Sequence, residues 1–302
     1  MIRLKINWLI KFVFVCSAIW LILWGVNLIL RQVNPLVSSP KLKPYLVIAH
    51  RGGAGLWPEN TLLAFRNSIK IGADALEFDV HATADGKLVV FHDSTVERTT
   101  NGSGRIDEMT WEELCRLDAG YYWTQDNGET YTYRGKGLTV PSLDEVLAEF
   151  SEIQMIIELK PATETIRSEF SRMISQNTTS TEIVIASFNT DNVKYIRTHN
   201  PQFATTSTVG EVFLFWILHI LGIEFLYSHG GDAMMVPPSV SSLPLATPKF
   251  VSRVQAHQIA IYIWTINSEE DLRRYSEVGF DGIITDYPDR LLRILGRPSK
   301  TN

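Results

Sequence analysis

The sequence predicts an α/β protein, an irregular (β/α)8 barrel with a loop insertion, preceded by an N-terminal transmembrane helix. Short β-rich runs alternate with helical patterns along most of the chain, as they do in parallel α/β folds. Most of these runs are continuously apolar, which is typical of parallel strands buried on both faces. An uncharged apolar stretch near the N-terminus predicts the membrane helix.

The strand pattern favours a TIM barrel of ~250 residues, which would use nearly everything after residue 44. The predicted strands are residues 45–49, 75–80, 87–91, 154–159, 182–186, 233–236, 260–264 and 282–285, and helical patterns include residues 60–71, 142–150, 163–176 and 269–278. Residues 204–208 are a further strand candidate, so one run must lie outside the barrel. The link between Val80 and Lys87 is too short for a crossover helix, which makes the barrel irregular there. No G-x-G-x-x-G turn follows a strand to favour an open doubly wound sheet.

The N-terminal segment, residues 1–44, is predicted to be a membrane anchor and linker, and residues 45–298 are predicted to form the barrel domain. Residues 12–30 carry no charge and are long enough to cross the ~30 Å hydrocarbon core of a bilayer. A cleaved signal peptide is the alternative, but its apolar region is usually shorter and no A-x-A-like cleavage site is found. Basic residues flank both ends of the stretch, so the side of the membrane stays open. We therefore expect a single-pass membrane protein.

Residues at about 94–141, here called the insertion, show little periodicity apart from a short helix at residues 110–117. Thr110 is expected to cap that helix, with Glu113 in the capping-box position. We interpret the insertion as an extension of a strand-to-helix loop. Such loops line the active site of a TIM barrel, so the insertion is expected to shape the substrate entrance.

Composition excludes some functions. The formal net charge is −5 and the basic residues are scattered, which argues against a nucleic-acid partner. No Cys/His spacing suggests a zinc site, so any metal ion would be held by oxygen ligands. The two cysteines lie in contexts that argue against a mutual disulfide. The sequence does not predict an oligomeric state.

Charged side chains lie at the ends of several predicted strands. Glu77 and Asp79 are two residues apart on one strand and therefore share a face, where two carboxylates repel each other unless a cation or a proton separates them. Together with Glu158 they would form an all-oxygen site for one divalent ion, Mg²⁺ or Ca²⁺. A single strand-end carboxylate is more often a helix cap or an ion pair. Several inward-facing carboxylates without a metal would cost several kcal/mol per ion.

Taken as a set, the motifs resemble those of the glycerophosphodiester phosphodiesterase family over about residues 46–290. The matching segments, in order, are His50-Arg51-Gly52, Pro58-Glu59-Asn60-Thr61, Glu77-Phe78-Asp79-Val80, His92-Asp93, Glu158-Leu159-Lys160, Ser187-Phe188, Trp264-Thr265-Ile266-Asn267 and Asp281-Gly282-Ile283-Ile284-Thr285-Asp286.

The resemblance implies a TIM barrel that hydrolyses glycerophosphodiesters to glycerol 3-phosphate and an alcohol, with a metal ion at the carboxylate positions already named. His50 and His92 would be the general acid and base, in either order, since an imidazole titrates near neutral pH. Arg51 and Lys160 would neutralise the substrate phosphate. The attacking group is either water or the neighbouring glycerol hydroxyl, in which case a cyclic phosphate forms first.

Three further residues are expected to support the site. Glu59 would be either an outer contact of the site or a carboxylate at a helix start, and Asn60 would either cap the following helix or face the metal. Trp264 would either stack on substrate or pack in the core.

Residues 212–226 form a second apolar stretch with no polar face, so something must cover it. The alternatives are a buried barrel helix, an oligomer contact, or an element that lies on the lipid bilayer, which we favour. If the stretch lies on the bilayer, a lysophospholipid is an alternative substrate, and the activity would then be that of a lysophospholipase D. A catalytically silent, membrane-tethered binding barrel is another class, but it predicts the loss of a metal carboxylate or a histidine, and all five are present.

Overall fold

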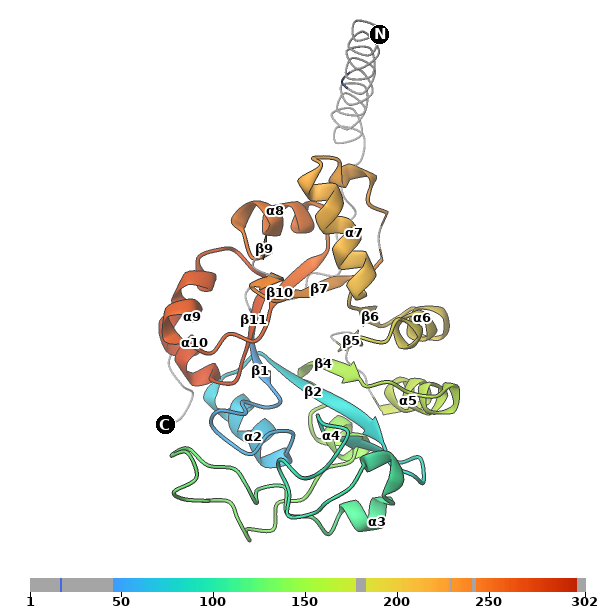
Figure 1. Cartoon of the computed structure of the whole chain (residues 1–302), viewed down its shortest axis with the longest axis vertical. Coiled ribbons are helices and arrows are strands. Elements are labelled where there is room, and N and C mark those ends of the chain that lie inside the picture. The colour runs from blue at the N-terminus through green and yellow to red at the C-terminus, as the bar shows by residue number, and fades with distance from the viewer. Residues whose placement is uncertain (1–16, 18–45, 178–182, 229, 241–242, 298–302) are drawn as a thin grey trace, which may run out of the picture.

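The computed structural model describes residue 17 and residues 46–177, 183–228, 230–240 and 243–297. Within them eight parallel strands form a near-closed barrel, whose elements are labelled in Figure 1. Neighbouring barrel strands follow the order β6-β5-β4-β2-β1-β11-β10-β7. The strands are β1 (Leu46–His50), β2 (Ala75–Ala82), β4 (Gln154–Leu159), β5 (Ile183–Ala186), β6 (Ala204–Thr205), β7 (Ala233–Val236), β10 (Ala260–Ile263) and β11 (Gly282–Thr285). A parallel bridge between Thr206 and Ala233 joins the two ends of this order. The predicted barrel is confirmed.

One predicted strand does lie outside the barrel. β3 (Leu88–Val90) pairs antiparallel with β2 on a tight turn, in which Thr83 N donates to Lys87 O over 3.0 Å. A turn this short can join only antiparallel strands, because a parallel pair needs a long crossover. The candidate at residues 204–208 supplies β6 and completes the barrel instead.

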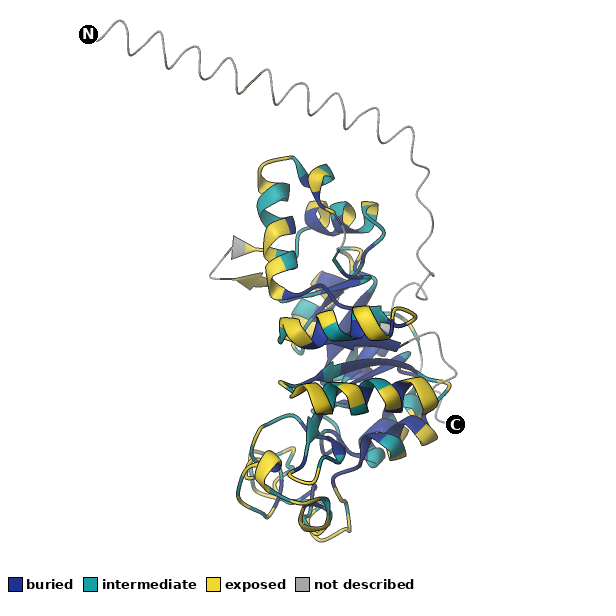
Figure 2. Cartoon of the chain, turned by 90° about the vertical axis from the view of Figure 1, so that its right-hand side faces the viewer, coloured by how far each residue is buried: buried dark blue, intermediate teal, exposed yellow. Residues whose placement is uncertain are grey.

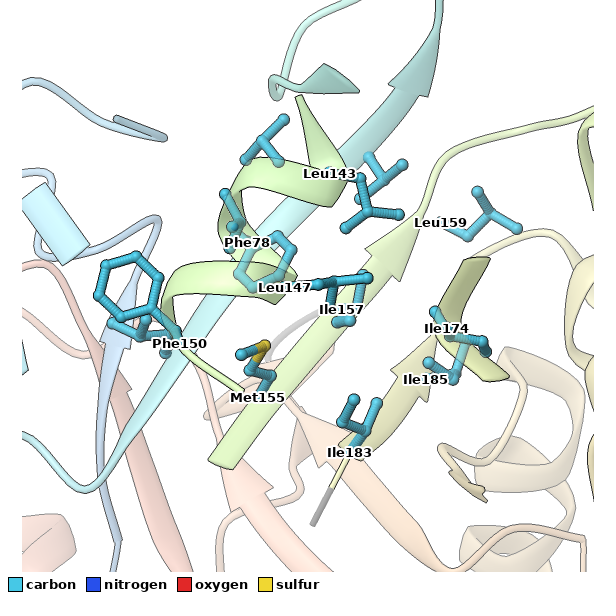
Figure 3. Packing of buried hydrophobic residues seen from close by; sticks show 14 of the residues in the cluster. Phe78, Leu143, Leu147, Phe150, Met155, Ile157, Leu159, Ile174, Ile183 and Ile185 are labelled. Atoms are coloured by element: carbon cyan, nitrogen blue, oxygen red, sulfur yellow. The ribbon is translucent and has the colours of Figure 1, made fainter. Parts of the chain in front are cut away.

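Helices lie on the outside of the barrel, with their exposed faces turned away from the buried strands (Figure 2). They are α2 (Leu62–Ile71), α4 (Leu143–Glu149), α5 (Glu164–Asn177), α6 (Thr190–His199), α7 (Val209–Ile220), α8 (Pro248–Ala256), α9 (Glu269–Ser276) and α10 (Pro288–Ile294). Short pieces are η1 (Ile106–Glu108), α3 (Trp111–Leu114), η2 (Glu224–Leu226), β8 (Ser239–Val240) and β9 (Leu243–Pro244). Apolar side chains between helices and strands form the core, as Leu147 of α4 shows beside Phe78 of β2 and Ile157 of β4 (Figure 3). Threonine caps begin several helices, including Thr61 at α2 and Thr208 at α7.

The insertion connects β3 to α4 and has a small core of its own. Val96, Ile106, Leu114 and Val140 pack there with Phe91. The predicted capping box is present, because the Thr110 hydroxyl accepts from Glu113 N while the Glu113 carboxylate accepts from Thr110 N. These apolar contacts and the cap give order to a segment that is polar in sequence.

The predicted membrane location needs correction. Among the residues that the structure describes, none of the helices combines the length and the apolarity needed to cross a bilayer. Apart from Ser17, the stretch 12–30 and the linker that follows it lie outside the described residues. The expectation of a single-pass membrane protein is therefore contradicted.

The second apolar stretch forms most of α7 and the turn after it. Phe215 is buried and packs against Phe250 and Tyr227, whereas Phe213 and Leu214 are exposed. The buried-helix alternative thus holds for one face of α7 only.

Candidate active site

Strand register brings the predicted carboxylates together at the carboxyl ends of the barrel strands. Asp79 of β2 lies beside Glu158 of β4, and Glu77 of β2 lies beside His50 of β1. The three carboxylates each place an oxygen within 4.8 Å of the others. Burial, reinforced by the charge of Asp79, raises the pKa of Glu77 well above its ordinary value. These are the properties expected of a site that receives a cation.

Two further observations show that the cluster fits a divalent ion. The Lys160 ammonium lies 2.7 Å from both Asp79 Oδ1 and Glu158 Oε1, so a cation already bridges two of the carboxylates. Asn60 donates to Asp79 Oδ2 over 3.1 Å, while its own Oδ1 is buried without a hydrogen-bond partner. A hard ion such as Mg²⁺ or Ca²⁺ accepts carboxylate and amide oxygens of this kind.

His50 ends β1 and is held by the carboxylate of Asp286, a residue of the Asp281–Asp286 motif for which the sequence predicted no role. Its Nδ1 lies 2.6 Å from Asp286 Oδ1, directly after β11, and Asn267 in turn donates to Asp286. Burial alone would lower the pKa of His50, but the Asp286 hydrogen bond and the charge of Glu77 outweigh it and raise the pKa. The strand-end rule that found the other residues also applies to Asp286.

His92 reaches the same site at the end of an antiparallel hairpin and not at the end of a barrel strand. Convergence of barrel strands does not explain its position, because β3 is not a barrel strand. The antiparallel hairpin brings it there, with Phe91 N donating to Asp79 O over 3.0 Å. His92 Nδ1 lies 2.6 Å from Asp93 Oδ1, so both histidines bind a carboxylate through the same ring nitrogen. His81 Nε2 contacts the carbonyl of His92 over 3.0 Å.

The two predicted phosphate-binding cations are largely buried rather than solvated. Lys160 bridges two carboxylates as described, and Arg51 Nη1 donates to Glu59 Oε1 over 3.0 Å. Arg51 Nε also lies 3.6 Å from Asp79 Oδ2. The tight turn after β1 that positions Arg51 requires glycine at position 52, where φ is 78° and a Cβ would lie 2.5 Å from the Phe65 ring.

The supporting residues take distinct places. Glu59 accepts from both Arg51 and Arg98, so it is an outer contact of the site. Thr61, and not Asn60, caps α2, which leaves Asn60 facing the carboxylate cluster. Trp264 follows β10, and its ring lies 5.9 Å from that of Phe188. Arg98 belongs to the insertion, and nothing in the sequence signals that it reaches the site.

A cavity of about 660 Å³ contains the catalytic candidates and continues along an apolar wall. Its charged and titratable lining residues are His50, Arg51, Glu77, Asp79, His92, Glu158 and Lys160. The wall is formed by Phe188, Val209, Val212, Phe213, Trp216, Met235, Val240, Leu245 and Trp264. The cavity therefore combines charged groups with an apolar wall, to which α7 contributes Val209, Val212, Phe213 and Trp216.

Two carboxylate-bound histidines, buried cations and clustered carboxylates meet at the mouth of a parallel barrel, an arrangement typical of an enzyme active site. The chain belongs to the Glycerophosphoryl diester phosphodiesterase family, whose model matches residues 50–290. It is accordingly a phosphoric diester hydrolase.

Known proteins resemble the chain over most of its length. A glycerophosphodiester phosphodiesterase of Caldanaerobacter subterraneus subsp. tengcongensis is 32% identical, with 83% of this chain and 97% of the relative covered. The structure of an Oleispira antarctica phosphodiesterase in complex with the product sn-glycerol-3-phosphate has a TM-score of 0.67 at 26% identity, covering 84% and 97% of the two chains. Lysophospholipase D GDPD1 of Mus musculus is 26% identical, with 81% and 84% covered.

Proposed function

We propose that residues 45–298 form a metal-dependent glycerophosphodiester phosphodiesterase that releases glycerol 3-phosphate and an alcohol. Glu77, Asp79 and Glu158 would hold one Mg²⁺ or Ca²⁺ ion, with Asn60 Oδ1 as a further oxygen. When bound, the ion would polarise a phosphoryl oxygen and lower the pKa of the attacking hydroxyl.

The residues of this chain supply proton transfer and charge neutralisation. One of His50 and His92 would take the proton from the attacking water or glycerol hydroxyl as the new phosphorus–oxygen bond forms. The other would give a proton to the alcohol oxygen as its bond to phosphorus breaks. Arg51 and Lys160 would turn from their carboxylate partners to the phosphate oxygens.

The single observation that carries this proposal is the symmetry of the two histidines. Each binds a carboxylate through Nδ1 at 2.6 Å, and both open on one cavity beside the carboxylate cluster. A carboxylate at Nδ1 fixes the tautomer and leaves Nε2 to exchange a proton with a ligand.

Product analysis with glycerophosphocholine tests the proposal. Wild-type protein is expected to release glycerol 3-phosphate and choline, to lose activity with EDTA and to regain it with Mg²⁺ or Ca²⁺. His50→Ala and His92→Ala are expected to lose about 10²–10⁴-fold in kcat. The exposed His199 supplies a control, His199→Ala, with unchanged kcat. Normal turnover by either active-site variant, or release of phosphocholine, would reject the assignment.

Lysophospholipase D activity is a second candidate, favoured by the apolar wall of the cavity. An acyl chain bound along Phe213 and Trp216 would leave the phosphodiester at the charged lining residues, and burial of apolar surface would contribute to affinity. Relatives from Mus musculus and Homo sapiens are named lysophospholipase D.

Two neighbouring substitutions on α7 separate the second candidate from the first. Phe213 lines the cavity and is 59% exposed, whereas Leu214 is 51% exposed and faces elsewhere. Phe213→Asp is expected to lower kcat/KM about tenfold for a short-chain monomeric lysophosphatidylcholine, with little change for glycerophosphocholine. Leu214→Asp is the matched control. Equal losses on both substrates would count against the acyl-chain site.

A further inference from the structure

Arg98 of the insertion joins the two sides of the active site. Its Nε donates to Asp93 Oδ2 over 2.5 Å, and its Nη1 and Nη2 each donate to a Glu59 carboxylate oxygen over 2.7 Å. Asp93 binds His92, and Glu59 binds Arg51. A continuous series of charged contacts therefore runs from the imidazole on one side of the site to the guanidinium on the other.

We propose that Arg98 is a positioning residue with two separable effects on the reaction. Through Asp93 it would hold the His92 ring in one orientation and tautomer, and through Glu59 it would hold Arg51 ready for the substrate phosphate. Arg98 acts through these neighbours, because it lines an adjoining pocket of about 710 Å³ rather than the catalytic cavity. This inference rests on the proposed function and adds to it the part played by the insertion.

The chemistry of the contacts explains why arginine is needed. A planar guanidinium presents several N–H groups in fixed directions and can bind one carboxylate with two of them while a third reaches another. A lysine ammonium at the same place would be a point charge and could not fix both carboxylates. Glu59 lies between two guanidinium groups, because its carboxylate accepts hydrogen bonds from both Arg98 and Arg51.

The two branches predict different kinetic defects. Asp93→Asn would loosen His92 and lower kcat with little change in KM, since it disturbs proton transfer. Glu59→Gln would weaken the hold on Arg51 and raise KM, since it disturbs phosphate binding. Arg98→Ala would do both, because it removes the partner that the two carboxylates share.

Steady-state kinetics with glycerophosphocholine and saturating divalent metal tests the inference. Arg98→Ala is expected to lower kcat and raise KM, each by about tenfold or more, as loss of an outer-contact residue commonly does. Arg105→Ala is the matched control, because Arg105 lies in the same insertion, has the same side-chain exposure of 48%, and binds Asp107 with two N–H groups. Its kcat and KM should stay within about twofold of wild type.

Chemical rescue distinguishes positioning from a general structural role. Arg98 is half exposed, so added millimolar guanidinium can reach the space left by Arg98→Ala and should restore part of kcat and KM, whereas sodium chloride at equal ionic strength should not. Arg98→Lys, which keeps the charge, should recover less than half of the lost kcat/KM on a logarithmic scale.

Two results would overturn the inference while leaving the proposed function intact. The first is an active wild-type enzyme in which Arg98→Ala has the same kcat and KM as Arg105→Ala. The second is an Arg98→Ala protein in which a smaller fraction of molecules is active, KM is unchanged and guanidinium does not restore activity. If Arg98→Ala does not fold, Arg98→Lys decides the question, and wild-type kcat and KM in that variant would reject the inference. An inactive wild-type protein would instead reject the proposed function.

Discussion

His50 and His92 illustrate how much a single contact defines at the residue scale. Each imidazole binds an aspartate through Nδ1, Asp286 for His50 and Asp93 for His92. The two aspartates differ in their own surroundings, because Asp286 is held by the Asn267 amide and Asp93 by the Arg98 guanidinium. Both histidines therefore bind an aspartate, but one aspartate is held by a neutral amide and the other by a charged guanidinium.

Asp286→Asn is expected to move the pH–rate limb that belongs to His50 toward lower pH. The Asp286 carboxylate stabilises the imidazolium form and is one reason why the pKa of His50 is raised. Its removal lowers that pKa, and the direction is the same whether His50 is the acid or the base. The measurement is kcat/KM against pH with glycerophosphocholine, because this ratio reports the pKa values of the free enzyme. Asp289→Asn, three residues further on and paired with Arg293, is the control, and an unmoved limb in Asp286→Asn would contradict the assigned contact.

At the element scale, the arrangement of β2, β4 and α4 matters most for the site. β2 supplies Glu77 and Asp79 to the interior while its opposite face, with Phe78, packs under α4. Two-residue periodicity separates these roles, so the same strand builds the carboxylate cluster and anchors it in the core. Loss of packing under α4 should therefore lower the free energy of unfolding more than it changes the catalytic rate.

Leu147→Ala is expected to lower the free energy of unfolding by about 2–5 kcal/mol, because it leaves a cavity in a fully buried cluster. Urea unfolding followed by circular dichroism measures the change. Leu214→Ala on the exposed side of α7 should change the free energy of unfolding by less than about 0.5 kcal/mol. Similar losses for the two variants would show that α4 does not pack on β2 and β4 as described.

At the scale of the whole molecule, barrel closure brings together residues that are far apart in the chain. β1 pairs with both β2 and β11, which is why His50 meets Glu77 and Asp286 at once. A ligand bound at this junction contacts elements from both ends of the domain. Its binding free energy should therefore add to the stability of the entire barrel.

Saturating Mg²⁺ or Ca²⁺ is expected to raise the Tm of the wild-type protein, because the ion binds the folded cluster and not the separated carboxylates of the unfolded chain. Glu77→Ala should lose most of this increase. Glu270→Ala, which removes an exposed carboxylate, should keep it. Differential scanning calorimetry with and without EDTA measures the effect, and equal increases in both variants would place the ion elsewhere.

The sequence by itself determined the barrel and the strand outside it, and it predicted the carboxylates and histidines that the structure brings together, because apolar runs and the charged residues at their ends are local signals. Continuous apolar runs mark buried parallel strands, and a link too short for a helix excludes one run from the barrel. The predicted membrane location was wrong, because it was inferred from hydropathy alone. Among the described residues, none of the helices is long and apolar enough to cross a bilayer.

Only the tertiary structure decided which groups support the site. Asp286 meets His50 across 236 positions of sequence, and Arg98 meets Glu59 across 39, distances over which no periodic pattern carries information. The tertiary structure also decided that a hairpin positions His92. It decided that one face of α7 is buried and that another face lines the cavity. These contacts depend on barrel closure and on the path of the insertion, whereas strand and helix patterns depend only on neighbours along the chain.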